Sequence, residues 1–359
     1  MKRSLIALAA LAVVGAASAQ VNGFAAGSGS SVTVFGVVDA TVAIGNGDTA
    51  NKTQLTNSGY NSSRLGFKGV EDMGGGLKAR FWLEASVAND NGAGGATNVN
   101  NQATGGALAG MNGSQGLAFG RSSWVALNGG FGEVRLGRDY SPQFWTLTVY
   151  DPFGTNGVGT TQTLNSSAGG VVTVRASNSV AYITPSMSGF VVWGMMYFGE
   201  NASNAASQAG DGAAIRAQYD MGPLSLAAAY SKTTTGAGTD VQTTNFGASY
   251  DMKVAQLIAH WNKDANTGAA DQTGYLVGAL IPVAPAGTVR VAYSTSDNGT
   301  AKTNKFALGY VYDMSKRTAL YGTFASLSNS GGAAQALNGA VTPANGSSTG
   351  FDLGIRHAF

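Results

Sequence analysis

The 359-residue sequence contains no cysteine, only 11% charged residues and no long apolar run after its first twenty residues. The absence of cysteine excludes a disulfide framework, a cysteine zinc site and a thiol nucleophile. A membrane-spanning helix needs about 18 consecutive apolar residues, so none is expected beyond residue 20. Lys and Arg number 21 against 19 Asp and Glu, without a basic block, so we expect no nucleic-acid partner.

Histidine is scarce as well, since His260 and His357 are the only two in the chain. They lie far apart and have no partner at the spacing that metal ligands need, so we expect no metal site and no other cofactor. No spacing of Ser, His and carboxylate residues supports a hydrolase. The sequence therefore does not predict an enzyme.

Glycine is abundant, with 53 residues or about 15% of the chain, roughly twice the usual share of about 7%. The N-terminus has the pattern of an export signal: Lys2 and Arg3, then the apolar run 5–17, then the small-residue site 17–19. We expect residues 1–19 to be a signal peptide and 20–359 to be the mature domain. Cleavage would lower the Lys and Arg count from 21 to 19, which equals the 19 acidic residues.

Segments of about ten residues with alternating apolar and polar positions recur along the mature chain, separated by Gly, Asn, Asp, Ser and Pro. This period of two predicts β-strands. Sixteen strands are predicted, at 31–43, 61–71, 76–88, 116–128, 132–140, 170–184, 189–199, 212–220, 223–232, 241–251, 253–263, 272–281, 287–296, 303–312, 317–328 and 348–359.

The connectors between these strands alternate between short and long. The short ones are 72–75, 129–131, 185–188, 221–222, 252, 282–286 and 313–316. The long ones are 44–60, 89–115, 141–169, 200–211, 233–240, 264–271, 297–302 and 329–347. Tight turns at one rim and long loops at the other are typical of a transmembrane β-barrel.

Charges gather on one face of the predicted strands. In 76–88, Lys78, Arg80 and Glu84 alternate with an apolar set, and the final strand 348–359 has the same alternation. Segments 189–199 and 253–263 leave the assignment of faces open. An apolar outer face can lie in lipid only if every backbone group is paired, so the sheet must close. Sixteen strands enclose more space than side chains fill, which predicts a water-filled channel.

Long stretches resemble the trimeric general porins of Gram-negative outer membranes, in particular their Gly-rich, anion-preferring branch. They are SVTVFGVVD (31–39), SRLGFKGVEDMGGGLK (63–78), GFGEVRLGRD (130–139), SKRTALY (315–321) and GIRHAF (354–359). The resemblance implies a 16-stranded antiparallel barrel, all-β, whose third loop (141–169) folds inward and narrows the pore.

The resemblance also implies an arginine ladder on the wall opposite that loop, matching Arg64, Arg121 and Arg175 in this sequence. The loop itself carries a single acid, Asp151, in YDPFG (150–154), which predicts a mild anion preference. Wall acids could offset this preference if they lie close to the arginines. Further residues that we expect to line the pore are Lys68, Arg80, Glu84, Glu133, Arg135, Asp139, Arg216 and Arg290.

The implied partners are two further copies in a homotrimer, outer-membrane lipid and lipopolysaccharide, and the small ions and hydrophilic solutes that diffuse through. Three alternatives stay open. The barrel could be plugged or adhesive, with loops that bind a partner, or it could be a channel for one particular solute, or the chain could be a soluble all-β protein. The longest connector, 141–169, is long enough for a constriction but short for a plug, which favours an open pore.

Overall fold

The structure is a computed structural model, and it describes residues 29–95, 97–102, 116–163 and 174–359. The predicted signal peptide, 1–19, lies outside these residues, as do parts of the connectors 89–115 and 141–169. Within the described residues, no helix is both long and apolar enough to cross a membrane.

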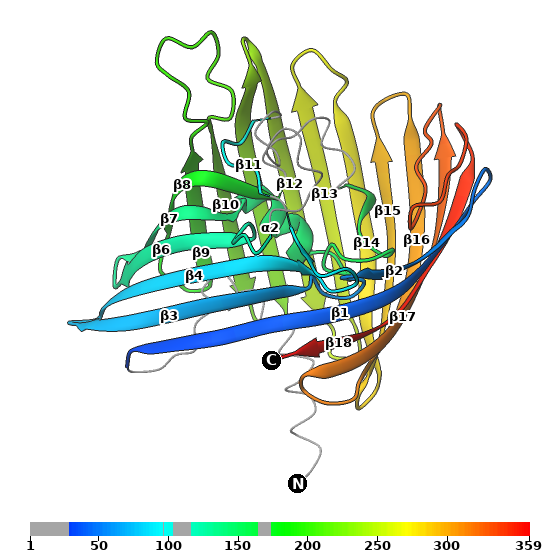
Figure 1. Ribbon diagram of the computed structural model, residues 1–359, viewed down its shortest axis with the longest axis horizontal. Helices are drawn as coiled ribbons and strands as arrows, with labels where there is room; N and C mark the ends of the chain where they lie inside the picture. The colour runs from blue at the N-terminus through cyan, green and yellow to red at the C-terminus, as the bar shows by residue number, and fades with distance from the viewer. Residues whose placement is uncertain (1–28, 96, 103–115, 164–173) are drawn as a thin grey trace.

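Sixteen long antiparallel strands form one closed barrel, as predicted (Figure 1). The last strand pairs with the first, from Val37 opposite Ala358 to Gly47 opposite Ser348, so the sheet has no free edge. The long strands are β1 (Ser31–Gly47), β3 (Arg64–Gly74), β4 (Leu77–Ala88), β6 (Ser122–Gly129), β7 (Gly132–Tyr140), β8 (Arg175–Ile183), β9 (Phe190–Tyr197), β10 (Gly212–Met221), β11 (Leu224–Gly236), β12 (Thr239–Asp251), β13 (Gln256–Asn266), β14 (Gln272–Ala284), β15 (Gly287–Asp297), β16 (Lys302–Asp313), β17 (Thr318–Ser330) and β18 (Ser347–Ala358).

Two short strands add to the sixteen, and both lie in connectors predicted as loops: β2 (Lys52–Asn57) and β5 (Ala93–Gly94). β2 pairs with the C-terminal part of β1, whereas β3 pairs with its N-terminal part. Between β2 and β3 the chain leaves the sheet over 58–63, because six residues occupy a gap that two residues of β1 face. This detour brings Tyr60 and its neighbours to the cavity inside the barrel.

The expected strict alternation of connector lengths is wrong at 233–240. β11 and β12 extend almost to each other there, and only two residues, Ala237 and Gly238, separate them. The glycine has a φ of 71°, which suits a tight hairpin turn. The predicted strand 116–128 begins six residues later than expected, at Ser122.

The predicted alternation of faces is confirmed. On β16, Phe306 and Leu308 are exposed on the outer wall, whereas Lys305, directly before Phe306, is 2% exposed and points inward, and Ala307 between the two is 1% exposed. The two strands whose faces the sequence left open are also settled. On β9, Trp193 is buried inside and Met196 is exposed outside; on β13, His260 lies inside.

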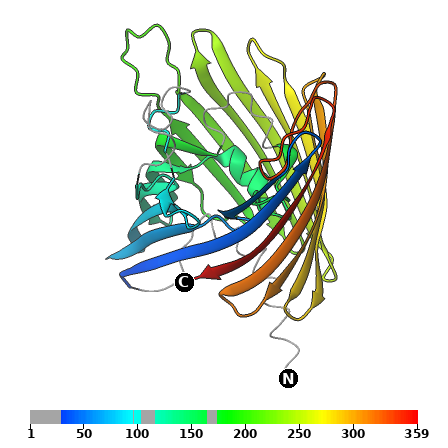
Figure 2. The same ribbon diagram turned by 45° about the vertical axis from the view of Figure 1, so that its right-hand side comes forward.

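The described part of the third long connector, 141–163, folds into the barrel, as its predicted role requires (Figure 2). It begins with helix α2 (Pro142–Val149), which the strand pattern did not predict. Ser141 caps the helix, and Pro142 occupies its first turn, where a missing N–H costs nothing. Arg216 of β10 donates to Thr146 Oγ1 at 3.1 Å, and Asn245 of β12 donates to the carbonyl of Gln143 at 2.9 Å. Both contacts hold α2 against the inner wall.

The same connector then runs along the opposite wall, where side chains of β13, β16 and β18 bind its backbone. Lys305 donates to the carbonyls of Val158 and Thr160. Asp352 accepts from Val158 N at 2.7 Å. His260 bonds the hydroxyls of Thr161 and Thr163 and the carbonyl of Tyr150. These buried contacts fix the described part of the connector inside the barrel.

An apolar cluster completes the anchoring. Tyr150, Phe153 and Val158 of the inward connector pack with wall residues and with Leu337 of the last connector. Two connectors that are distant in sequence thus share one small core.

Candidate functional site: a charged cavity inside the barrel

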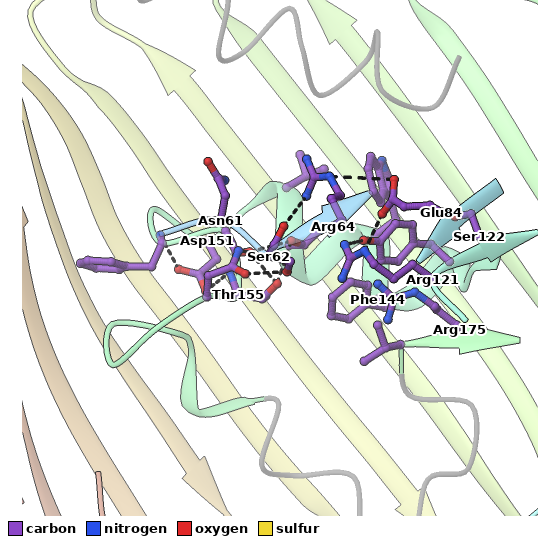
Figure 3. Close-up of a pocket in the computed structure, with 18 of the residues that line it drawn as sticks. Asn61, Ser62, Arg64, Glu84, Arg121, Ser122, Phe144, Asp151, Thr155 and Arg175 are labelled. Carbon is purple, nitrogen blue, oxygen red and sulfur yellow. Dashed lines mark hydrogen bonds and ion pairs between the residues drawn. The ribbon is translucent and has the colours of Figure 1, made fainter. Parts of the chain in front are cut away.

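A cavity of about 790 Å³ lies between the inward connector and the barrel wall. One side is formed by β3, β4, β6, β7 and the start of β8 (Figure 3). The other is formed by α2, the segment 151–156, and residues of β10 to β15 and of β18. Its charged lining residues are Arg64, Lys68, Glu84, Arg121, Arg135, Asp139, Asp151, Arg175, Arg290 and Arg356.

The structure places all four predicted constriction residues, Arg64, Arg121, Arg175 and Asp151, around this one cavity. Of the further predicted lining residues, Lys68, Glu84, Arg135, Asp139 and Arg290 lie there too, whereas Arg80, Glu133 and Arg216 lie elsewhere on the inner wall. The effect of each residue on conduction stays a prediction.

Glu84 of β4 lies between two of the three ladder arginines. Arg121 Nε is 2.5 Å from Glu84 Oε1, and Arg64 Nε is 3.9 Å from Glu84 Oε2. Arg121 also donates to the hydroxyl of Tyr140 at 2.6 Å, and Arg64 donates to the carbonyl of Ser62. One carboxylate therefore offsets part of the charge of two guanidinium groups.

Arg175 differs from them, because no ion pair to it exists among the described residues. Its guanidinium carbon lies 4.4 Å from the centre of the Tyr140 ring, which stacks in turn on Phe144 of α2. A guanidinium on an aromatic face keeps its full charge. Arg175 thus presents an uncompensated positive charge to the cavity.

A second group of charges on the same wall is internally balanced. Glu133 bonds both Arg80 and Arg135, and Arg135 also bonds Asp139, whose second oxygen accepts from Ser122. Two arginines and two carboxylates cancel in this network. Arg80 and Arg135 are therefore expected to contribute little to the field in the cavity.

Asp151, the predicted loop acid of the constriction, is turned towards its own backbone. Its Oδ1 accepts from Phe153 N at 2.9 Å, and its Oδ2 accepts from Thr155 N and Thr161 N at 3.1 and 3.0 Å. Three amide dipoles surround the carboxylate and stabilise its charge. The residue holds the connector in shape, and its negative charge faces backbone donors.

The opposite side of the cavity carries a second pair of arginines around Tyr60. Arg290 of β15 lies 4.2 Å and Arg356 of β18 lies 5.2 Å from the centre of that ring. Neither forms an ion pair with any described residue. Arg356 is not among the residues predicted to line the pore, although the alternation of the last strand puts it on the inner face with Asp352.

The charge balance of the cavity is clearly positive. Seven cationic side chains and three carboxylates line it, which leaves four positive charges in excess. This excess appears only in the folded chain, because the 21 Lys and Arg and 19 Asp and Glu nearly cancel overall. Folding thus concentrates positive charge around this cavity.

Tyr150 closes the C-terminal end of α2 against the wall. Its hydroxyl forms a hydrogen bond with Ser225 Oγ at 2.9 Å. Its ring packs directly on Gly247, so closely that a Cβ added to this glycine would lie 2.1 Å from Cδ2 of Tyr150. Burial raises the pKa of the Tyr150 hydroxyl above its usual value, and the bond to Ser225 opposes that rise. Because residue 247 is a glycine, Tyr150 of the inward connector can pack closely against the barrel wall.

Comparison with known proteins decides the family. A family model described as Gram-negative porin matches residues 5–332. The chain belongs to the Gram-negative porins.

Relatives support the assignment over the whole length. Outer membrane porin protein 32 of Delftia acidovorans is 38% identical, with complete coverage of both chains. An outer membrane porin protein of Bordetella pertussis is 29% identical, again over both complete chains. The solved structure of the anion-selective porin from Comamonas acidovorans superposes with a TM-score of 0.80 at 36% identity, covering 92% of this chain and all of the other.

The porin is therefore an outer-membrane channel for passive diffusion and not an enzyme. The closed barrel without a free edge agrees with that location. Among the described residues, no group of three or more His, Cys, Asp or Glu side chains could hold a metal ion.

Proposed function

We propose that this porin conducts small hydrophilic solutes and ions with a preference for anions, set by the arginines of the central cavity. The excess of four positive charges in its lining supports the proposal most directly. Arg64, Arg121 and Arg175 act on one wall and Arg290 and Arg356 on the other. The similar structure from Comamonas acidovorans is named anion-selective, which agrees with this proposal.

The strength of the preference follows from the distance of the charges to the ion path. A unit charge about 10 Å from an ion contributes roughly 0.4 kcal/mol in bulk water. Each uncompensated charge attracts an anion and repels a cation, so it changes the ratio of their permeabilities about two- to fourfold. Salt weakens the effect and low-dielectric walls strengthen it. A preference rather than strict selection is expected.

The porin is further proposed to be a homotrimer, as its resemblance to general porins implies, with outer-membrane lipid and lipopolysaccharide around its outer wall. Residues 1–19 are proposed to be removed on export, which leaves 20–359 as the mature barrel domain. N-terminal sequencing of the purified protein and the mass of unheated samples in detergent test these two statements.

Conductance across a planar bilayer tests the proposed function. Purified protein in a potassium chloride gradient is expected to give stepwise currents with a reversal potential of anionic sign. Replacing Arg64, Arg121 and Arg175 by Gln leaves one positive charge in excess in the lining and is expected to reduce that potential strongly while conductance remains. A folded protein without conductance would favour a plugged or adhesive barrel, and currents that saturate with a single solute would favour a specific channel.

A further inference from the structure

Aromatic side chains are concentrated around the cavity. Nine of its 35 lining residues are aromatic, whereas aromatics make up 9% of the chain. Four of the five tryptophans of the protein are among them: Trp82, Trp124, Trp145 and Trp193. Transmembrane barrels usually place aromatic residues on the outer wall near the lipid interfaces and keep the lumen polar. Trp145 and Trp193 pack in an apolar cluster between α2 and the wall, whereas the rings of Phe35, Tyr60, Trp82 and Tyr140 are only half-buried and face the cavity.

Cations lie against these rings on both walls of the cavity. Lys68 Nζ is 4.9 Å from the centre of the Trp82 ring, and Arg175 is 4.4 Å from that of Tyr140. Across the cavity, Arg290 is 4.2 Å from the centre of the Tyr60 ring. On each wall, a positive charge and a flat aromatic surface thus lie next to each other.

We propose that the cavity transiently binds aromatic carboxylates and passes them in preference to aliphatic carboxylates of the same charge and size. This inference rests on the proposed anion preference and names the solute class of the same site. The carboxylate would pair with Arg290 or Arg356, neither of which has an ion-pair partner among the described residues. The ring would stack on Tyr60 or on the plane of a guanidinium.

Tyr60 is the position best placed for this contact. It is half-buried, it stands on the detour 58–63 away from the sheet, and Arg290 and Arg356 both lie against its ring. The neighbouring Phe153 of the inward connector also faces Arg290, at 5.8 Å. An aliphatic anion could satisfy only the charges at this point, because it has no flat face to stack.

The test compares benzoate with cyclohexanecarboxylate as blockers of chloride current through the full-length protein in planar bilayers. The concentration of benzoate that halves the current is expected to be about three- to tenfold lower than that of cyclohexanecarboxylate. This factor corresponds to the affinity that an aromatic pair adds beyond its buried area. Tyr60→Leu is expected to reduce this ratio to below twofold, and Tyr60→Phe to preserve it. Tyr293→Leu, on the outer wall of β15, serves as the control with an unchanged ratio.

The reversal potential measured in the same membranes separates this inference from the proposed function. Anion preference together with equal potency of the two blockers would overturn the inference and leave the proposed function intact. An unchanged ratio in Tyr60→Leu, with the normal heat-modifiable mobility of a folded barrel, would overturn the assignment to Tyr60. Loss of anion preference in the unmodified protein would overturn both.

Discussion

Arg121 and Glu84 form a buried ion pair inside the barrel, with Nε and Oε1 2.5 Å apart. Arg64 lies on the other side of the same carboxylate. The arginine ladder implied by the sequence is therefore interrupted by one acid, and the net charge of this wall is smaller than three. Arg175, together with the pair around Tyr60, carries the charge that remains uncompensated.

Replacing Glu84 by Gln should strengthen the anion preference. The amide oxygen can still accept from Arg121, but the negative charge between the two arginines is gone. We expect the ratio of chloride to potassium permeability to rise about two- to fourfold, measured as a shift of the reversal potential in a salt gradient. The double variant Glu84→Gln with Arg121→Gln keeps the net charge and should stay near the unmodified value. A fall of the ratio in Glu84→Gln would contradict the account.

Replacing Lys305 by Met should loosen the inward connector. Lys305 is 2% exposed and donates to two loop carbonyls, at Val158 and Thr160. Each buried carbonyl left without a donor costs about 1–3 kcal/mol. Single-channel recordings are expected to show a higher and noisier open conductance. Lys302→Met, on the same strand but exposed, is the matched control, and equal traces for the two variants would disprove the anchoring role.

Introducing Ala at Gly247 should displace Tyr150 and, with it, the end of α2. A Cβ at this position would lie 2.1 Å from the ring, and overpacking of this kind costs about 1–3 kcal/mol. We expect the folded form to be lost at a lower midpoint temperature, as measured by the change in gel mobility on heating. Gly322→Ala is the control, because its Cβ would meet nothing closer than 3.8 Å. Equal midpoints for the two variants would count against the packing described.

The strands and their faces could be predicted because the alternation of apolar and polar residues along a strand depends only on neighbouring positions in the sequence. Lys305 and Phe306 show this, since adjacent positions alternate between the inside and the lipid-facing wall. The inward course of the third connector was expected only from resemblance. Helix α2 within it was missed, because PQFWTLTV has eight residues and no helical pattern longer than two turns.

The pairing of charges could not be predicted in the same way. Glu84 meets Arg121 because of the register between β4 and β6, and 37 positions separate them in the chain. Tyr60 reaches Arg290 and Arg356 only because the chain leaves the sheet between β2 and β3. The sequence names candidate charges, whereas their neutralisation depends on contacts that only the closed barrel creates.

Arg175 offers the most direct test of the central claim, that uncompensated lumen arginines set the ion preference. The reversal potential of the channel in a potassium chloride gradient should be compared among the unmodified porin and the variants Arg175→Lys and Arg175→Gln. The account predicts that Lys keeps the anionic sign and nearly the full size of the potential, and that Gln lowers the permeability ratio about two- to fourfold. Equal potentials for Lys and Gln, or a cationic sign in the unmodified protein, would contradict it.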